Sequence, residues 1–255
     1  MKKILVVDFG SQYTQLIARR LRELSVYSEV CPWDEIPVLD DVEGFILSGG
    51  PESSNIEGNP TIDSLIFNTN KPILGICYGM QVLAHQEAGQ IINEGKKEFG
   101  YAKINIKADT VLFKNISDSS DVWMSHGDKV ESLPDGYSIT ATSDNSPIAA
   151  YENISKKYFG LQFHPEVTHT ENGTGIIKNF LDICGIEQNW SSDDILQQID
   201  AVVAAEVKDQ EVLLALSGGV DSTVLAAVLH RTLGNRLTCV MVDHGLLRKD
   251  EAQNV

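Results

Sequence analysis

Short apolar runs alternate with helix-like segments through the first third of the chain. The expected strands are Ile4–Val7, Val26–Val30, Phe45–Leu47 and Pro72–Ile76, and the expected helices are Gln15–Leu24 and Thr61–Phe67. Buried strands that alternate with helices favour a mainly parallel sheet covered by helices. Because ligands of such sheets bind beyond the carboxyl ends of the strands, a functional site is expected in the turns that follow them.

The segment 91–163 has a different pattern. Strand-like runs at Ile104–Ile106, Tyr137–Thr142, Ile148–Tyr151 and Tyr158–Phe163 are separated by turn-rich links with little helix between them. We therefore expect an antiparallel layer added to an open, mainly parallel sheet, which makes the fold class α/β. A helix over about 175–183 is expected to close this unit.

A second unit is expected to begin near residue 188. Ser191 and Asp194 have the spacing of a capping box, and they predict a helix that continues to about Val207. The strand Val212–Leu216, a helix over 222–232 and the strand Leu237–Val242 then repeat the βαβ pattern. Two strands do not make a stable parallel domain. The expected organisation is therefore a complete domain over 1–187 and the incomplete start of a second α/β domain over 188–255.

The composition excludes several classes of protein. The formal net charge of −16 argues against non-specific binding to nucleic acid or anionic lipid. The four cysteines are widely spaced, a pattern that suits a reducing compartment and predicts a cytoplasmic protein without a structural metal site. The apolar run after Met1 is too short for a signal peptide, and no stretch is long enough for a membrane helix.

Cys77 lies in a sequence that places nucleophiles. Gly75-Ile76-Cys77-Tyr78-Gly79 follows an apolar strand and precedes a helix-like run, which is the arrangement of a nucleophile elbow. The flanking glycines would remove β-carbons that clash where strand and helix cross. The helix N-terminus would favour a thiolate, which is the reactive form.

A cysteine nucleophile needs a base and a group that orients the base. His164 follows a predicted strand, and Glu166 lies two residues later, so we expect the triad Cys77, His164 and Glu166. His126 is the rival candidate for the base. Backbone N–H groups of Tyr78 and Gly50 are expected to stabilise an oxyanion.

The motifs GGP (49–51), GICYGMQ (75–81) and FHPE (163–166) resemble, in this order, those of class I glutamine amidotransferase domains. The resemblance covers about residues 1–185 and implies a flavodoxin-like fold. It implies that Cys77 attacks the side-chain amide of glutamine, forms a thioester and releases ammonia. It also implies that Gln81, Ser125 and Gly127 contact glutamine.

Ser217-Gly218-Gly219-Val220-Asp221-Ser222 joins a predicted strand to a predicted helix, and such a turn can bind anions through its backbone N–H groups. The hexapeptide resembles the pyrophosphate loop of N-type ATP pyrophosphatases, which implies ATP with Mg²⁺ as its counter-ion and no tightly bound cofactor. The residues expected to contact ATP are Ser217, Gly218, Gly219, Val220, Asp221, Ser222, Thr223 and Val242. The segment 242–248 resembles the corresponding family segment but has His244 in place of Asn, and Arg248 could equally belong to an ordinary surface loop.

A triad glutaminase followed by this loop resembles the GMP synthetases. That resemblance implies synthesis of GMP, AMP, pyrophosphate and glutamate from XMP, ATP, glutamine and water. It also implies a homodimer formed through a region outside this chain. The triad alone would also fit carbamoyl-phosphate, anthranilate or CTP synthesis. Two alternatives stay open: a stand-alone amidotransferase that serves another synthase, and a non-catalytic regulator that binds glutamine.

Overall fold

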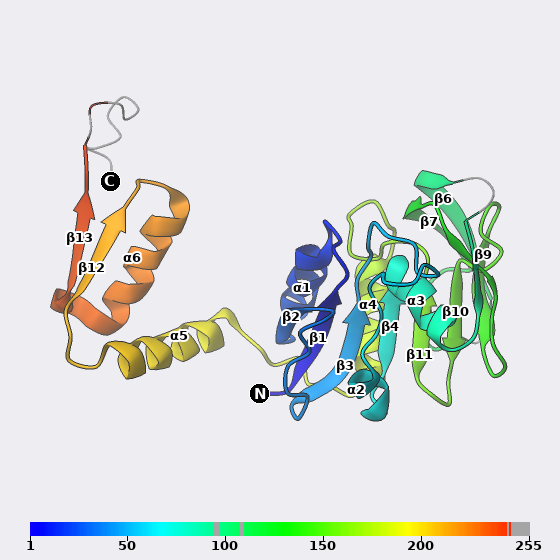
Figure 1. Cartoon of the computed structure of the whole chain (residues 1–255), viewed down its shortest axis with the longest axis horizontal. Helices are drawn as coiled ribbons and strands as arrows, with labels where there is room; N and C mark the ends of the chain where they lie inside the picture. The colour runs from blue at the N-terminus through cyan, green and yellow to red at the C-terminus, as the bar shows by residue number, and fades with distance from the viewer. Residues whose placement is uncertain (94–96, 108–109, 244, 246–255) are drawn as a thin grey trace. The chain divides into compact units, whose positions relative to one another are not determined.

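The computed structural model describes residues 1–93, 97–107, 110–243 and 245. The chain divides into two compact units, Met1–Asn189 and Trp190–Val255 (Figure 1). Among the described residues, no helix has both the length and the apolar character needed to cross a bilayer.

The first unit is built on a sheet of nine strands in the order β2-β1-β3-β4-β11-β10-β9-β6-β7. The strands of this unit are β1 (Lys3–Asp8), β2 (Ser28–Pro32), β3 (Val42–Leu47), β4 (Ile73–Ile76), β5 (Gln90–Ile92), β6 (Glu98–Ile106), β7 (Ser119–His126), β8 (Lys129–Ser132), β9 (Ser138–Ser143), β10 (Ala150–Asn153) and β11 (Tyr158–Leu161). Its helices are α1 (Thr14–Glu23), α2 (Ser64–Asn68), α3 (Tyr78–Gln86) and α4 (Gly173–Cys184). Strands β2, β1, β3, β4 and β11 pair in parallel, and β11, β10, β9, β6 and β7 pair antiparallel. The predicted α/β fold with an added antiparallel layer is confirmed.

Both faces of the parallel half are buried, which explains its continuous apolar runs. On β1, Ile4 and Val6 pack into the core that contains residues of α1 and α4. Leu5 and Val7 point to the opposite face and pack into the core that contains residues of α2 and α3. All four side chains are fully buried. Helices therefore cover the sheet on both sides (Figure 1), and the turns at the strand ends remain as the places where functional groups can reach solvent.

Three strands, β5, β7 and β8, were not predicted. Strand β7 alternates buried and partly exposed positions, but two of its buried side chains are Ser120 and His126. The apolar alternation that marks a half-buried strand is therefore weak in its sequence. Helix α2 begins at Ser64, later than the predicted Thr61, because the side chain of Asp63 caps it by accepting a hydrogen bond from the Leu65 N–H.

The second unit contains α5 (Ser192–Val207), β12 (Val212–Leu216), α6 (Val220–Leu233), the short 3₁₀ helix Gly234–Arg236 and β13 (Leu237–Met241). Strands β12 and β13 form a two-stranded parallel sheet. The predicted capping box of α5 is present, and the carboxylate of Asp194 accepts from the Ser191 N–H at 2.7 Å. The strands leave apolar side chains uncovered, with Leu213 71% exposed.

Candidate active site

Cys77 lies between β4 and α3, at the tip of a sharp turn. Its backbone has φ 54° and ψ −106°, a conformation that side-chain-bearing residues rarely adopt. The Cys77 N–H donates to the Leu161 carbonyl at 2.7 Å, and this bond fixes the turn to strand β11. Strained backbone of this kind persists where the surrounding structure enforces it, and it is concentrated at functional sites.

The two glycines of the elbow allow helix α3 to cross the sheet closely. A β-carbon on Gly75 would lie 2.5 Å from the backbone of Gly79. A β-carbon on Gly79 would lie 2.3 Å from the carbonyl oxygen of Leu47. Both contacts are too short for any side chain, so the spacing of the two glycines around Cys77 is a steric requirement.

Gly79→Ala is therefore expected to destabilise the first unit. The obstructing atoms belong to backbone, so the helix or the strand must move, and overpacking of this kind costs about 3 kcal/mol. For a unit of this size, that corresponds to a fall in the thermal midpoint of roughly 6–12 °C. Calorimetry of Gly79→Ala beside Gly175→Ala checks it. At Gly175 a β-carbon meets only the flexible end of Ile116, and an equal loss in both variants would contradict the steric account.

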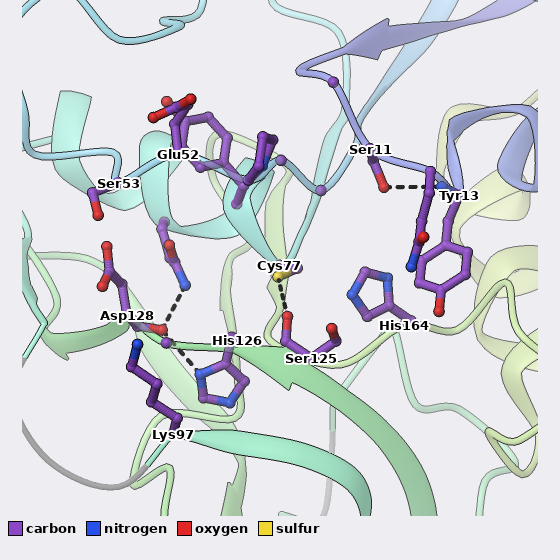
Figure 2. Close-up of a pocket in the computed structure, with 18 of the residues that line it drawn as sticks. Ser11, Tyr13, Glu52, Ser53, Cys77, Lys97, Ser125, His126, Asp128 and His164 are labelled. Carbon is purple, nitrogen blue, oxygen red and sulfur yellow. Dashed lines mark hydrogen bonds between the residues drawn. The ribbon is translucent and has the colours of Figure 1, made fainter.

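His164 lies beside the sulfur and is backed by Glu166. Nδ1 of His164 is 2.7 Å from Oε1 of Glu166, and both side chains are almost completely buried. A carboxylate accepts hydrogen bonds, so Nδ1 donates to Glu166. The Cys77 thiol itself donates to the Ser125 carbonyl at 3.5 Å, and Cys77 and His164 line the same cavity. Figure 2 shows the imidazole next to Cys77. The structure thus brings together all three residues of the predicted triad.

Burial opposes a charge on His164, but the Glu166 carboxylate, its hydrogen bond to the ring and the nearby Cys77 sulfur outweigh it. Together they raise the pKa of His164 to about 10. An imidazolium beside the sulfur is the partner that a thiolate requires.

Neighbouring groups fix the position of this pair. The His164 N–H donates to the Trp123 carbonyl at 3.0 Å, and the Thr170 hydroxyl donates to the His164 carbonyl at 2.6 Å. Nε of Arg20, on helix α1, donates to the Glu166 carbonyl at 2.9 Å. The ring of Tyr13 packs edge-on against the imidazole, with the centroids 5.1 Å apart.

His126, the rival base, has both ring nitrogens engaged elsewhere. Nδ1 is 2.9 Å from the Asp128 carbonyl, and Nε2 is 3.1 Å from Oε2 of Glu98. Burial lowers the pKa of His126 despite the nearby Glu98 carboxylate. The geometry therefore favours His164 as the base.

A cavity of about 580 Å³ opens at Cys77. Every residue predicted to touch glutamine or the oxyanion lines it: Gly50, Tyr78, Gln81, Ser125 and Gly127. Gly50 has no room for a side chain, because a β-carbon would lie 2.8 Å from the Phe9 carbonyl oxygen. The backbone of Gly50 can therefore approach the elbow closely, as an oxyanion donor must.

The cavity also contains charged residues that sequence reasoning missed. Glu52, Lys97 and Asp128 line it, and Figure 2 shows them around the same opening as Cys77. Oδ2 of Asp128 is buried and has no hydrogen-bond partner among the described residues. Asp128 directly follows Gly127, a predicted substrate contact, and this position next to the predicted site was the signal available in the sequence.

The predicted pyrophosphate loop links β12 to α6. Gly219 is the N-cap of α6, and Gly218 has φ +77°, a conformation that glycine adopts without strain. The loop is held by its own hydroxyls: Oγ atoms of Ser217 and Ser222 lie 3.1 Å apart, and the Thr223 hydroxyl donates to the Gly219 carbonyl at 2.9 Å. Asp221 lies in the first turn of α6, and Val242 follows β13 with 70% of its surface exposed. His244 and Arg248 lie outside the described residues.

Comparison with known families agrees with this geometry. Residues 5–184 match the family "glutamine amidotransferase class-I", and residues 192–255 match the PP-loop domain. The chain therefore belongs to the class I glutamine amidotransferase family.

The chain is also similar to GMP synthases. The chain is 48% identical to a GMP synthase (glutamine-hydrolysing) of Vibrio vulnificus over 258 residues, which is 100% of this chain and 50% of that protein. A GMP synthase of Shewanella piezotolerans is also 48% identical, over 99% of this chain and 51% of its own length. The chain thus spans about half the length of the curated relatives it matches.

Solved structures share the fold. A Thermoplasma acidophilum protein described as one subunit of a GMP synthase matches with a TM-score of 0.63 and 31% identity, over 78% of this chain and 98% of its own. The PurLQS structure from Thermotoga maritima matches with a TM-score of 0.59 at 20% identity, over 71% of this chain and 99% of that one, and it shows the fold alone.

Proposed function

We propose that residues 1–187 hydrolyse glutamine with Cys77 as nucleophile, His164 as base and Glu166 as the group that orients His164. The observation that carries this proposal is that the His164 imidazole lies next to Cys77, with the buried Glu166 carboxylate bonded to its far side, at the wall of a cavity large enough for an amino acid (Figure 2). Membership of the amidotransferase family supports it.

In this mechanism the sulfur of Cys77 attacks the side-chain carbonyl carbon of glutamine. The N–H groups of Gly50 and Tyr78 stabilise the oxyanion that develops. His164 gives its proton to the leaving nitrogen as the C–N bond breaks, and ammonia departs from a thioester. A water molecule then gives a proton to His164 and attacks the thioester, which releases glutamate and restores Cys77.

The charged end of the cavity suits the α-amino and α-carboxylate groups of glutamine. We assign the buried Oδ2 of Asp128, which has no partner within the described part of the chain, to the α-ammonium group, and the Lys97 ammonium to the α-carboxylate. Gln81 and the Ser125 to Gly127 backbone complete the predicted substrate contacts. Neutral glutamine analogues without these groups should bind weakly.

The second unit is proposed to be part of an ATP-binding domain over residues 188–255 and beyond. Its loop would bind the phosphates of ATP through the backbone N–H groups of Ser217–Thr223, with Val242 near the adenine. The PP-loop match and the GMP synthase relatives support this assignment. Within the described part of the chain no cluster of three or more His, Cys, Asp or Glu side chains could hold a metal, so Mg²⁺ would bind mainly through the nucleotide phosphates.

The complete reaction would join the two activities. XMP reacts with ATP to form adenylyl-XMP and pyrophosphate, and ammonia from the first unit displaces AMP to give GMP. XMP binding and homodimerisation would involve regions outside this chain. The activity is assigned to the cytoplasm, as suits soluble nucleotide metabolism.

Asp221→Ala in the full-length gene product tests the link between the units. We expect ATP-dependent formation of GMP and pyrophosphate to fall by roughly two orders of magnitude or more, because a group beside the transferring phosphates is lost. Glutamine-directed labelling of Cys77 should persist. Unchanged amination would favour the alternative of a stand-alone amidotransferase that serves another synthase.

A further inference from the structure

Glu98 and His126 form a buried pair at the cavity wall, of which His126 is a part. They lie directly opposite each other on β6 and β7, and their side chains are 7% and 2% exposed. Oε2 of Glu98 is 3.1 Å from Nε2 of His126. The proposed mechanism uses neither side chain, so the presence of two ionisable groups at this position needs a separate explanation.

The contacts of His126 determine where its proton is. Nδ1 faces the Asp128 carbonyl at 2.9 Å, and a carbonyl only accepts, so Nδ1 carries a hydrogen. Nε2 faces a carboxylate oxygen, and two lone pairs would repel each other. A hydrogen therefore lies between Nε2 and Oε2 and links the two side chains.

Three further donors fix the carboxylate. The hydroxyl of Ser146 donates to Oε2 of Glu98 at 2.6 Å. Asn145 and Ser143 donate to Oε1 at 3.3 and 3.4 Å. Hydrogen bonds to a carboxylate hold it in a single orientation, so Glu98 is a rigid anchor for the imidazole.

The pair is connected to the substrate cavity through one carbonyl group. The Asp128 carbonyl accepts from Nδ1 of His126 and also, at 2.7 Å, from Nε2 of Gln81. Nε2 of Gln81 donates as well to Oε1 of Gln162 at 3.2 Å. Both amide hydrogens of Gln81 are thereby used, so its carbonyl oxygen is the atom left for a substrate in the cavity.

The same segment reaches the nucleophile. The carbonyl of Ser125, the residue before His126, is 3.5 Å from the Cys77 sulfur. The walls of the cavity from Ser125 to Asp128 therefore depend on where His126 is held (Figure 2).

We propose that the Glu98–His126 pair is a positioning device for glutamine binding, which holds the Asp128 carbonyl and through it orients Gln81 and the Ser125–Asp128 wall toward the substrate. This inference rests on the proposed glutaminase function. It assigns a role to both residues in positioning and none in proton transfer to the substrate. It predicts that disruption of the pair weakens binding and leaves the reactivity of the sulfur intact.

The test measures inactivation of the full chain by a diazoketone analogue of glutamine, because its saturation kinetics separate binding (KI) from the bond-forming step (kinact). Glu98→Leu removes the acceptor, and we expect KI to rise about 10- to 100-fold, as a buried hydrogen-bonding group is left without its partner. We expect kinact to stay within about threefold. Glu98→Gln can donate an N–H to Nε2 of neutral His126, so both constants should stay within about threefold of the parent chain.

Controls keep the result interpretable. Lys103→Ala removes an exposed ion pair with Asp121 on the same strands and should change neither constant. If Glu98→Leu does not fold, Ser146→Ala replaces it as the test variant. This change removes the hydroxyl that donates to the Glu98 carboxylate and leaves the carboxylate itself in place. A rise in KI supports the proposal, and an unchanged KI overturns it.

Three outcomes overturn the inference alone: an unchanged KI in folded Glu98→Leu, equal impairment of the Leu and Gln variants, or a loss confined to kinact. Absence of labelling in the parent chain would overturn the proposed glutaminase function, and the inference with it.

Discussion

Replacement of Cys77 with alanine is expected to reduce glutamine hydrolysis by at least about three orders of magnitude. Loss of a covalent nucleophile leaves only the contributions of the oxyanion donors and of substrate binding. The cavity, His164 and Glu166 would remain in place, so glutamine should still bind. Release of glutamate, followed in a coupled assay, measures the loss.

Cys239→Ala is the matched control, because Cys239 is an exposed thiol of the second unit and does not line the cavity. Its activity should equal that of the parent chain. A Cys77→Ala variant that keeps a normal thermal midpoint and more than about a tenth of the parent's activity would contradict covalent catalysis by this sulfur.

Glu166→Gln is expected to lower kcat by about two to four orders of magnitude, by analogy with the loss of the orienting acid in other triads. The side-chain amide introduced at position 166 can donate an N–H where the carboxylate only accepted. This favours the tautomer of His164 in which Nδ1 accepts and does not carry the hydrogen. The variant also removes the negative charge that stabilises the imidazolium. The KM for glutamine should change little, because Glu166 is fully buried behind His164 and does not line the cavity.

The pH profile gives a second readout of the same change. In the parent chain the pKa of His164 is raised to about 10, so the imidazolium persists through neutral pH and is lost as the pH rises through about 10. Without the Glu166 charge the pKa of His164 falls, and the alkaline limb of kcat/KM should move toward neutral pH. Glu131→Gln, an exposed carboxylate on β8, is the control. An alkaline limb that stays in place in Glu166→Gln would contradict the assignment of Glu166.

The elbow could be predicted from the sequence because its glycines have a fixed spacing around the nucleophile. A β-carbon on Gly75 would meet Gly79 within the elbow itself, and one on Gly79 would meet Leu47 on β3, so the same spacing is required wherever a helix crosses a strand this closely. The position of His164 after a strand was also readable, since the ends of neighbouring parallel strands meet at one edge of a sheet. The pairing of β11 with β4 places the two turns side by side.

The antiparallel half was harder to predict. Strand β7 buries Ser120 and His126 among its inward positions, so its polar residues hid the strand pattern. The Glu98–His126 pair depends on the register between β6 and β7, which is a long-range property. The same holds for Asp128, because its place in the cavity lining depends on how distant segments of the chain come together.

The central claim is that the Cys77 sulfur, activated by His164, attacks the amide carbon of glutamine. Peptide mapping by mass spectrometry after inactivation with the diazoketone analogue of glutamine tests it most directly. The account predicts one adduct per chain, on the peptide that contains Cys77, with protection by glutamine and no adduct in Cys77→Ala. An adduct on Cys31, Cys184 or Cys239, or one that forms equally well in Cys77→Ala, would contradict it.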